Sequence, residues 1–179
     1  MENAENSRHL LRRLTQFVRY KHARRGQLLP LADELGMAGV LFELSQARFG
    51  EQLVTEVVCA PGGEVDLNAC YVPHYAVLAF VENSVYHAFN DTEPPWRVAV
   101  RVRRSDGTVT VVVEDNGSGF DPQPYLHRDG AVSVADAETY GSLPVTLARL
   151  SAQFGRDHTV QLESSADGGT RAAITMPVG

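Results

Sequence analysis

The sequence predicts an α+β fold: a two-layer α/β sandwich in which a mixed, mostly antiparallel sheet carries its helices on one face, preceded by a helical segment. Three observations support this prediction. The 179 residues, of which 44% are hydrophobic and 21% charged, suit one globular domain. Paired strand patterns alternate with single helical patterns along the chain. The regular βαβ order of a Rossmann domain is missing, because the glycine pair after one predicted strand opens a long loop rather than a helix.

Two helices are predicted to open the chain. Residues 4–23 repeat apolar side chains at spacings of three and four, and Gly26 is a stop signal. Pro30 then opens a second helix, with Asp33 and Glu34 in the first turn, where the helix dipole favours negative charge. Gly50 ends this second helix. We expect the two helices to form a hairpin.

The stretch 73–90 is predicted as one helix with a polar stripe. At about 100° per residue, five polar or half-polar side chains share an arc of roughly 140°; they are Glu82, Asn83, Tyr86, His87 and Asn90. The remaining arc is the packing side, and its members are Val77, Leu78, Val81, Ser84, Val85, Ala88 and Phe89. The stripe combines an acid, a carboxamide and an imidazole, which together can hold a metal and move a proton. A solvated surface face is the alternative interpretation.

The rest of the chain alternates strands with one further helix. The predicted elements, in order, are a strand at 52–59, a hairpin of strands at 97–103 and 108–114, a helix at 143–154, and strands at 158–164 and 170–176. The run Val111 to Val113 predicts a central position for the strand that contains it. About twenty residues after Phe120 lack periodicity, a length usual for a lid or binding loop.

Composition limits the functional classes. The net charge of -6 and the pI near 5.5 argue against nucleic acid as a partner. No apolar run approaches the roughly 20 residues that cross a bilayer, and the polar start does not resemble a signal peptide, so we expect a cytoplasmic domain. Cys59 and Cys70 lack zinc-type spacing and are expected to be buried thiols.

Basic residues concentrate at the amino-terminal end of the chain. Seven of the sixteen basic residues belong to the first helix, and they are Arg8, Arg12, Arg13, Arg19, Lys21, Arg24 and Arg25. A solvated helix face explains them by default. A docking surface for an acidic partner is the alternative.

Two motifs then carry a family resemblance. Residues 81–87, Val-Glu-Asn-Ser-Val-Tyr-His, and residues 113–120, Val-Glu-Asp-Asn-Gly-Ser-Gly-Phe, resemble the N box and the G1 box of the GHKL (Bergerat) ATP-binding fold. That fold is shared by sensor histidine kinases, type II topoisomerases, mismatch-repair ATPases and Hsp90 chaperones. The closest likeness is to LytS-type sensor histidine kinases. Support for this subgroup comes from Leu14 to Tyr20, Arg48-Phe49, Arg149-Leu150 ahead of Phe154-Gly155, and Gly168-Gly169-Thr170.

The resemblance implies where ATP and Mg²⁺ would bind. Asp115 would accept a hydrogen bond from the adenine amine, Thr170 would lie at the same purine edge, and Gly117 and Gly119 would let the backbone approach the nucleotide. Asn83 would give its amide oxygen to Mg²⁺. The full nucleotide-binding set implied is Asn83, Asp115, Gly117, Gly119, Phe120, Gly141, Ser142, Leu143 and Thr170.

The same resemblance implies the catalytic residues. Glu82 would act as general base, or would orient and polarise the attacking group. His87 would lie close to the phosphates, although a partly buried structural histidine is an equal alternative. Tyr86 stands where many relatives have lysine.

The sequence departs from the family pattern in two places. The second glycine box is altered at 140–145, where Tyr140 and Ser142 replace glycines and Val145 replaces asparagine. A helix amino terminus there would still offer N–H groups to phosphate. The Asn-Pro-His-Phe motif that carries the acceptor histidine of LytS-type kinases is absent, so the acceptor would lie outside this chain.

The implied function is that of the catalytic, ATP-binding domain of a sensor histidine kinase. It would transfer the γ-phosphoryl of Mg·ATP to an acceptor-histidine helix of the same or a partner subunit, for relay to a response regulator. Residues 1–26 would be the tail of the dimerisation helices, compatible with a homodimer, and residues 27–179 the catalytic domain. The alternative is a degenerate GHKL nucleotide-binding module without kinase activity. A serine kinase or GHKL hydrolase is disfavoured by the long amino-terminal helix pair.

Overall fold

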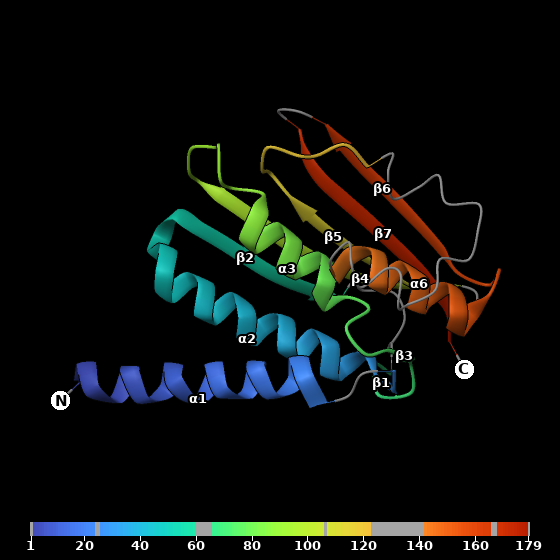
Figure 1. Ribbon diagram of the computed structural model, residues 1–179, viewed down its shortest axis with the longest axis horizontal. Helices are drawn as coiled ribbons and strands as arrows, with labels where there is room; N and C mark the ends of the chain where they lie inside the picture. The colour runs from blue at the N-terminus through green and yellow to red at the C-terminus, as the bar shows by residue number, and fades with distance from the viewer. Residues whose placement is uncertain are drawn as a thin grey trace.

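The computed structural model of the chain describes residues 2–23, 26–59, 66–105, 107–122, 142–165 and 168–178. Its helices are α1 (Glu2–Ala23), α2 (Leu31–Phe49), α3 (Leu78–His87) and α6 (Ser142–Phe154), with a 3₁₀ turn η1 (Gly50–Gln52) after α2. Its strands are β1 (Leu28–Pro30), β2 (Leu53–Cys59), β3 (Tyr71–Pro73), β4 (Trp96–Ser105), β5 (Thr108–Asp115), β6 (Thr159–Ser165) and β7 (Gly169–Pro177). Figure 1 shows these elements in one view.

Five of the strands form one mixed sheet, in the order β2-β4-β5-β7-β6. Only the β2–β4 pair is parallel among these described strands, since β4–β5, β5–β7 and β6–β7 are antiparallel. Strand β5 occupies the centre, as the valine run predicted, with Val109, Val111 and Val113 buried on one side. The predicted hairpin and the mostly antiparallel character of the sheet are confirmed.

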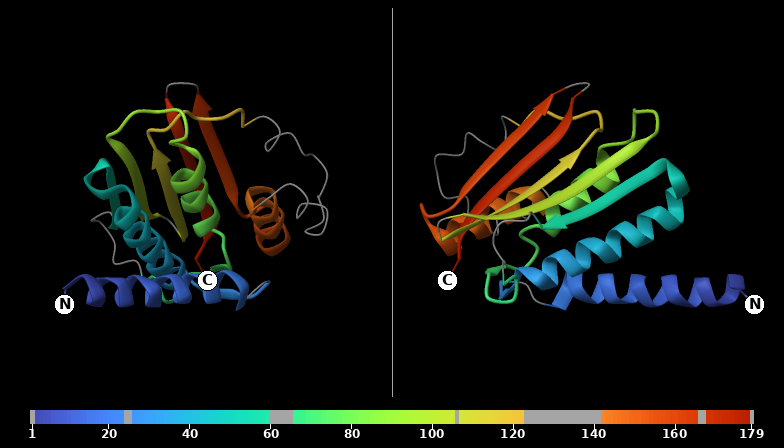
Figure 2. Two further views of the ribbon diagram at one scale, coloured as in Figure 1. Left: turned by 60° about the vertical axis from the view of Figure 1, so that its left-hand side comes forward. Right: turned by 180° about the vertical axis from the view of Figure 1, so that it is seen from behind.

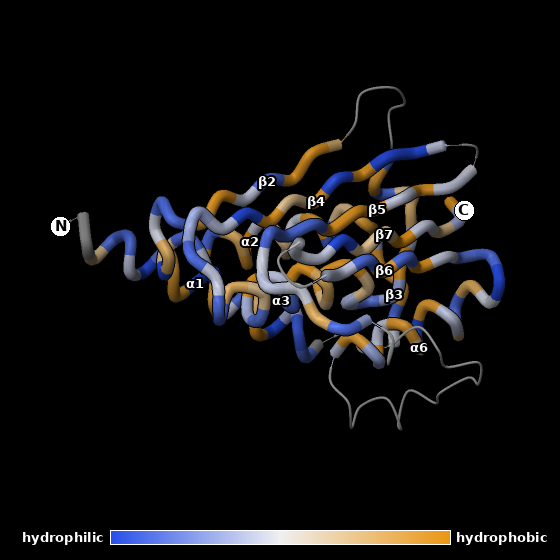
Figure 3. The backbone as a smooth tube through the Cα atoms, turned by 90° about the horizontal axis from the view of Figure 1, so that it is seen from above, coloured by the Kyte–Doolittle hydropathy of each residue, from blue (hydrophilic) through white to orange (hydrophobic). Residues whose placement is uncertain are grey.

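The helices cover one face of this sheet. Figure 2 shows α2, α3 and α6 on the same side of the strands, with α1 packed outside α2 as the expected hairpin partner. The strands alternate between apolar and polar stretches (Figure 3), as a half-buried sheet requires. On the uncovered face, Arg101 pairs with Glu56 and Glu114, and Arg171 also pairs with Glu114. The predicted two-layer α/β sandwich is therefore confirmed.

The helix predicted at 73–90 is shorter than expected. Residues 71–73 form β3, which pairs antiparallel with β1, and α3 begins only at Leu78. Both short strands were missed, because three residues are too few to show a strand period. Tyr75 then turns the chain with φ of 73°, a left-handed conformation that is rare for a bulky side chain.

Glu34 explains how α3 begins without a capping side chain of its own. The carboxylate of Glu34 on α2 is fully buried and accepts the backbone N–H groups of Tyr75, Val77 and Leu78 at 2.8, 3.0 and 3.0 Å. The Tyr20 hydroxyl of α1 donates to the same carboxylate. One acid therefore stabilises the amino terminus of α3 and joins α1, α2 and α3.

Two further expectations have structural outcomes. Cys70 is buried as expected, but the expectation for Cys59 is wrong, because it is exposed at the end of the edge strand β2. The expected lid after Phe120 falls mainly on residues 123–141, which lie outside the described residues. Among the described helices, none combines the length and apolar character needed to cross a bilayer.

Candidate functional site

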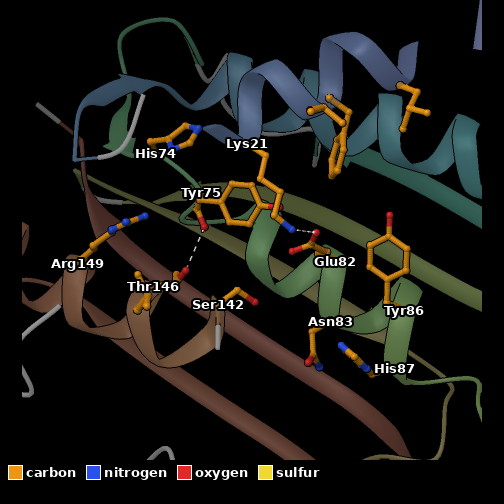
Figure 4. A pocket seen from close by; sticks show the side chains of 14 residues that line it. Lys21, His74, Tyr75, Glu82, Asn83, Tyr86, His87, Ser142, Thr146 and Arg149 are labelled. Carbon is orange, nitrogen blue, oxygen red and sulfur yellow. Dashed lines mark hydrogen bonds and ion pairs between the residues drawn. The ribbon is translucent and has the colours of Figure 1, made fainter. Parts of the chain in front are cut away.

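Four residues of the polar stripe of α3 line a cleft of about 870 Å³. Figure 4 shows the cleft with α1, α3 and α6 around it. Its described lining residues are Leu14, Phe17, Val18, Lys21, His74, Tyr75, Glu82, Asn83, Tyr86, His87, Ser142, Val145, Thr146 and Arg149. Four of the five stripe residues are present, whereas Asn90 lies exposed beyond the end of α3.

Glu82 lies on the α1 side of this cleft. Its side chain is 11% exposed, and its Oε1 accepts a hydrogen bond from the Lys21 ammonium of α1, with 2.5 Å between Nζ and Oε1 (Figure 4). The ammonium also lies 5.6 Å from the centre of the Tyr75 ring. The predicted general base is thus ion-paired with a residue from the amino-terminal helix, which the sequence analysis did not single out.

Asp115 ends β5 with its carboxylate directed at three protein donors. Its Oδ2 accepts the Ser84 hydroxyl at 2.6 Å, and its Oδ1 accepts the N–H groups of Gly117 and Thr170 at 3.0 and 3.1 Å. A carboxylate offers about four lone-pair positions. One acceptor position is therefore left for a ligand such as an exocyclic amine.

The two glycines of the G1 box face the protein's own backbone. A Cβ on Gly117 would lie 2.3 Å from the Ala88 carbonyl oxygen at the end of α3, and one on Gly119, where φ is +67°, would lie 2.3 Å from the Ser165 carbonyl oxygen. The family resemblance implied that these glycines make room for a nucleotide. The structure gives a different reason, since both let β5, α3 and β6 approach one another closely.

A second, much smaller cavity is lined by Ser84 and Thr170, which both donate to Asp115, although Asp115 itself lines neither this cavity nor the cleft among the described residues. It measures about 10 Å³, and its described lining includes Asn83, Phe120, Leu143 and Thr170. Asn83 lines both this cavity and the large cleft, and its neighbour Ser84 donates to Asp115. Asn83 of the N box and Phe120 of the G1 box therefore line the same small cavity, and Ser84 joins the two boxes through Asp115.

The remaining predicted nucleotide residues are Gly141, Ser142 and Leu143. Ser142 is the first residue of α6 and lines the large cleft, while Leu143 is buried. Gly141 lies outside the described residues. The helix amino terminus that the sequence predicted at this box is therefore present at Ser142.

The described residues suit a magnesium ion held mainly by a nucleotide. No group of three or more His, Cys, Asp or Glu side chains that could hold a metal occurs among them. The Asn83 amide is half-buried and lines the cleft. Mg²⁺ commonly takes few protein oxygens and completes its shell from phosphates and water, so one carboxamide fits this chemistry.

Two tyrosines, Tyr75 and Tyr86, also line the cleft. Burial, and then the negative charge of Glu82, raises the pKa of the Tyr75 hydroxyl and of the Tyr86 hydroxyl. Both phenols therefore remain protonated at neutral pH. His87 is exposed at the end of α3, so the alternative interpretation of it as a partly buried structural histidine is wrong.

Three residues of the site were not predicted, two in the cleft and one in the small cavity. Lys21 and Arg149 bring positive charge from α1 and α6, and Ser84 holds the Asp115 carboxylate. The sequence feature that could have drawn attention to Lys21 is that it is the only lysine in the chain. Ser84 was assigned to the packing side of α3, which is correct, although its hydroxyl was not given a partner.

Comparison with known proteins agrees with this geometry. Residues 73–179 match a family described as "Histidine kinase-, DNA gyrase B-, and HSP90-like ATPase". The chain is 29% identical over 177 residues to "Sensor protein LytS" of Bacillus anthracis, covering 98% of this chain and 29% of that protein. It is 31% identical over 181 residues to "Sensor protein LytS" of Oceanobacillus iheyensis, covering 98% of this chain and 30% of that protein.

A solved structure supports the fold. The chain matches the Acinetobacter baumannii histidine kinase AdeS with a TM-score of 0.57 and 14% identity, over 99% of this chain and 81% of the other. The similarity at this identity concerns the fold alone. The chain spans less than a third of the length of the curated relatives named above.

Proposed function

Because the chain belongs to the histidine kinase-, DNA gyrase B- and HSP90-like ATPase family, as its N box and G1 box predicted, we propose that it is the ATP-binding catalytic domain of a sensor histidine kinase. The observation that carries the proposal is that Ser84 connects the Asp115 carboxylate to the part of α3 that lines the cleft. This residue donates to Asp115 and directly follows Asn83, which lines the cleft that contains Glu82. Ser84, Asn83 and Glu82 are consecutive residues of α3, so this helix offers neighbouring groups for a purine, a metal and a proton.

Asp115 and Thr170 bind the purine in this proposal. The free acceptor position of the Asp115 carboxylate receives the adenine amine, and three protein donors hold that carboxylate in place. Thr170 lines the adjoining cavity with Phe120 and Leu143. Asn83 would hold Mg²⁺, which, when bound, neutralises phosphate charge during transfer.

Glu82 then orients the acceptor. The imidazole nitrogen of an acceptor histidine attacks the terminal phosphorus, the bond from that phosphorus to the bridging oxygen breaks, and ADP leaves with the electron pair. Glu82 accepts a hydrogen bond, or the proton, from the acceptor imidazole. His87, exposed at the cleft edge, contacts the phosphates or the incoming helix.

The partners follow from the kinase proposal. The acceptor histidine belongs to a helix of the same or a partner subunit, and a response regulator takes the phosphoryl group from it. Residues 1–26 form the tail of the dimerisation helices and residues 27–179 the catalytic domain. The curated LytS relatives named above are described as sensor proteins, and more than two thirds of their length lies outside the match.

Two variants test the proposal. Asp115→Asn should weaken ATP binding by about 10- to 100-fold, because it removes a charged acceptor worth roughly 1.5–3 kcal/mol. Titration calorimetry with Mg·ATP measures this loss, and an unchanged affinity would refute the adenine assignment. Glu82→Gln should keep nucleotide binding and lose phosphoryl transfer to a separately supplied acceptor-helix domain. Unaffected transfer would remove Glu82 from the mechanism.

One observation favours a second candidate, a nucleotide-binding regulatory module without kinase activity. The cavity beside Asp115 measures only about 10 Å³ among the described residues, roughly the space of one water. A purine therefore requires Phe120 or Leu143 to move. The altered second glycine box at 140–145 also favours a module without kinase activity. ATP binding without transfer to any acceptor domain would establish this second function.

A further inference from the structure

Lys21 is the only lysine in the chain, and α1 places it in the cleft. Its side chain is 42% exposed, so the ammonium remains accessible although it pairs with Glu82. Figure 4 shows the lysine side chain lying beside the Tyr75 ring, with its nitrogen directed at the Glu82 carboxylate. The other basic residues of α1 named by the sequence analysis do not line this cleft, among the residues the structure describes.

The charges of the cleft are unevenly placed. Among its described lining residues, the permanent cations are Lys21 on α1 and Arg149 on α6, and the carboxylate is Glu82. A triphosphate needs cationic donors, whereas a lone carboxylate would repel it. Lys21 is the cation that directly contacts this carboxylate, at 2.5 Å.

The order of groups around α3 decides which phosphate would reach Lys21. At about 100° per residue, Asn83 lies between Ser84 and Glu82 around the helix axis. Ser84 contacts Asp115, Asn83 lines both cavities, and Glu82 contacts α1 through Lys21. A nucleotide with its adenine at Asp115 and its metal at Asn83 therefore directs its last phosphate toward Lys21.

We propose that Lys21 binds the terminal phosphate of ATP and bridges it to Glu82, so that α1 completes the nucleotide site. This inference rests on the ATP-binding function proposed above. A lysine ammonium has three N–H donors, of which one is directed at Glu82, and the others are available to phosphate oxygens. The positive charge between two negative groups lowers their mutual repulsion, which lets the carboxylate work next to the transferred group.

Binding measurements on a matched pair of variants test this role. Lys21→Met keeps the length of the side chain and removes its charge, while Arg12→Met removes a charge from an exposed position of the same helix outside the cleft. Lys21→Met should weaken Mg·ATP binding by about tenfold or more and change Mg·ADP binding far less. Arg12→Met should change neither, and Lys21→Arg should restore most of the preference for ATP over ADP.

Other outcomes would overturn the proposal. Equal losses for ATP and ADP in Lys21→Met would place the lysine away from the terminal phosphate. Unchanged or tighter ATP binding would mean that the Lys21–Glu82 ion pair only joins α1 to α3 and that Lys21 does not bind phosphate. If the unmodified chain binds neither nucleotide, the proposed function itself fails, and the lysine assignment fails with it.

Chemical modification of the unmodified chain gives a second readout that needs no variant. Because there is one lysine, acetylation by an amine-reactive ester followed by peptide mass spectrometry reports on Lys21 alone. Mg·ATP should slow its acetylation more than Mg·ADP does, with the α-amino group of the chain as the internal control. Equal acetylation rates with the two nucleotides would overturn the proposal.

Discussion

Replacing Glu34 by glutamine should destabilise the whole domain, because this buried carboxylate forms the start of α3. Glu34 is 0% exposed. Its Oε1 accepts the Tyr20 hydroxyl and the Tyr75 N–H, and its Oε2 accepts the Val77 and Leu78 N–H groups. Glutamine keeps the shape of the side chain but converts one acceptor oxygen into an N–H₂ donor.

The magnitude follows from the better of the two amide orientations. With the nitrogen at the Oε1 position, the Tyr20 hydroxyl can rotate and accept, but the Tyr75 N–H is left without an acceptor, at a cost of about 1–3 kcal/mol. The bonds that remain change from charged to neutral and lose roughly 1 kcal/mol each. Removing the buried charge offsets part of this loss, so we expect a net destabilisation of about 2–4 kcal/mol.

Urea unfolding followed by circular dichroism measures this change, with Glu163→Gln as the control. Glu163 carries the same chemistry on an exposed strand, where its side chain is 69% exposed and lies 3.8 Å from Arg171. The control should change the free energy of unfolding by less than about 0.5 kcal/mol. A Glu34→Gln variant as stable as the control would refute the role of Glu34 at the start of α3.

Two further predictions concern groups away from the cleft. Cys59 is exposed, whereas Cys70 is 3% exposed and burial raises the pKa of its thiol. DTNB should therefore react rapidly with Cys59 and should reach Cys70 only after the domain unfolds. Rapid reaction of Cys70 in the folded Cys59→Ser variant would contradict its burial. The hydrogen bond from His9, aided by the charge of Arg13 and opposed by burial, lowers the pKa of Glu43 below 4.5, so its contribution is present above pH 4.5 and lost as pH falls through the folded-state pKa. Glu43→Gln should therefore cost less than about 1 kcal/mol near pH 6 and nothing at pH values below the folded-state pKa, which paired urea titrations at several pH values would measure.

The sheet and the packing side of α3 could be predicted because their residues repeat with a regular period. Val98, Val100 and Val102 are buried and alternate with residues that are exposed or half-buried, as a half-buried strand requires. The parallel pairing of β2 with β4 could not be predicted, since strand direction depends on the path of the intervening chain. The β1–β3 pair was not predicted for a different reason, because each of its strands has only three residues.

Within the candidate site, the motifs gave the identity of the residues but not their contacts. The Asp115 carboxylate was predicted to accept the adenine amine, but its protein partners Ser84 and Thr170 come from α3 and β7, which meet only in the folded chain. The glycines were interpreted as space for a ligand, although Gly117 is needed for the approach of Ala88. Sequence spacing reports residues on one element, whereas these contacts join several.

The amino-terminal helix shows why a boundary drawn from sequence at residues 26 and 27 separates groups that act together. Tyr20 donates to Glu34 at the start of α3, and the next residue, Lys21, contacts Glu82 in the middle of α3. Two adjacent residues of α1 thus contact the two carboxylates of Glu34, which caps the start of α3, and of Glu82, the proposed general base. A rotation of α1 that moves one contact must move the other, because the side chains leave the same helical turn. If residues 1–26 continue a dimerisation helix, a movement of that helix therefore reaches both the cap and the proposed base of the kinase site through a single turn.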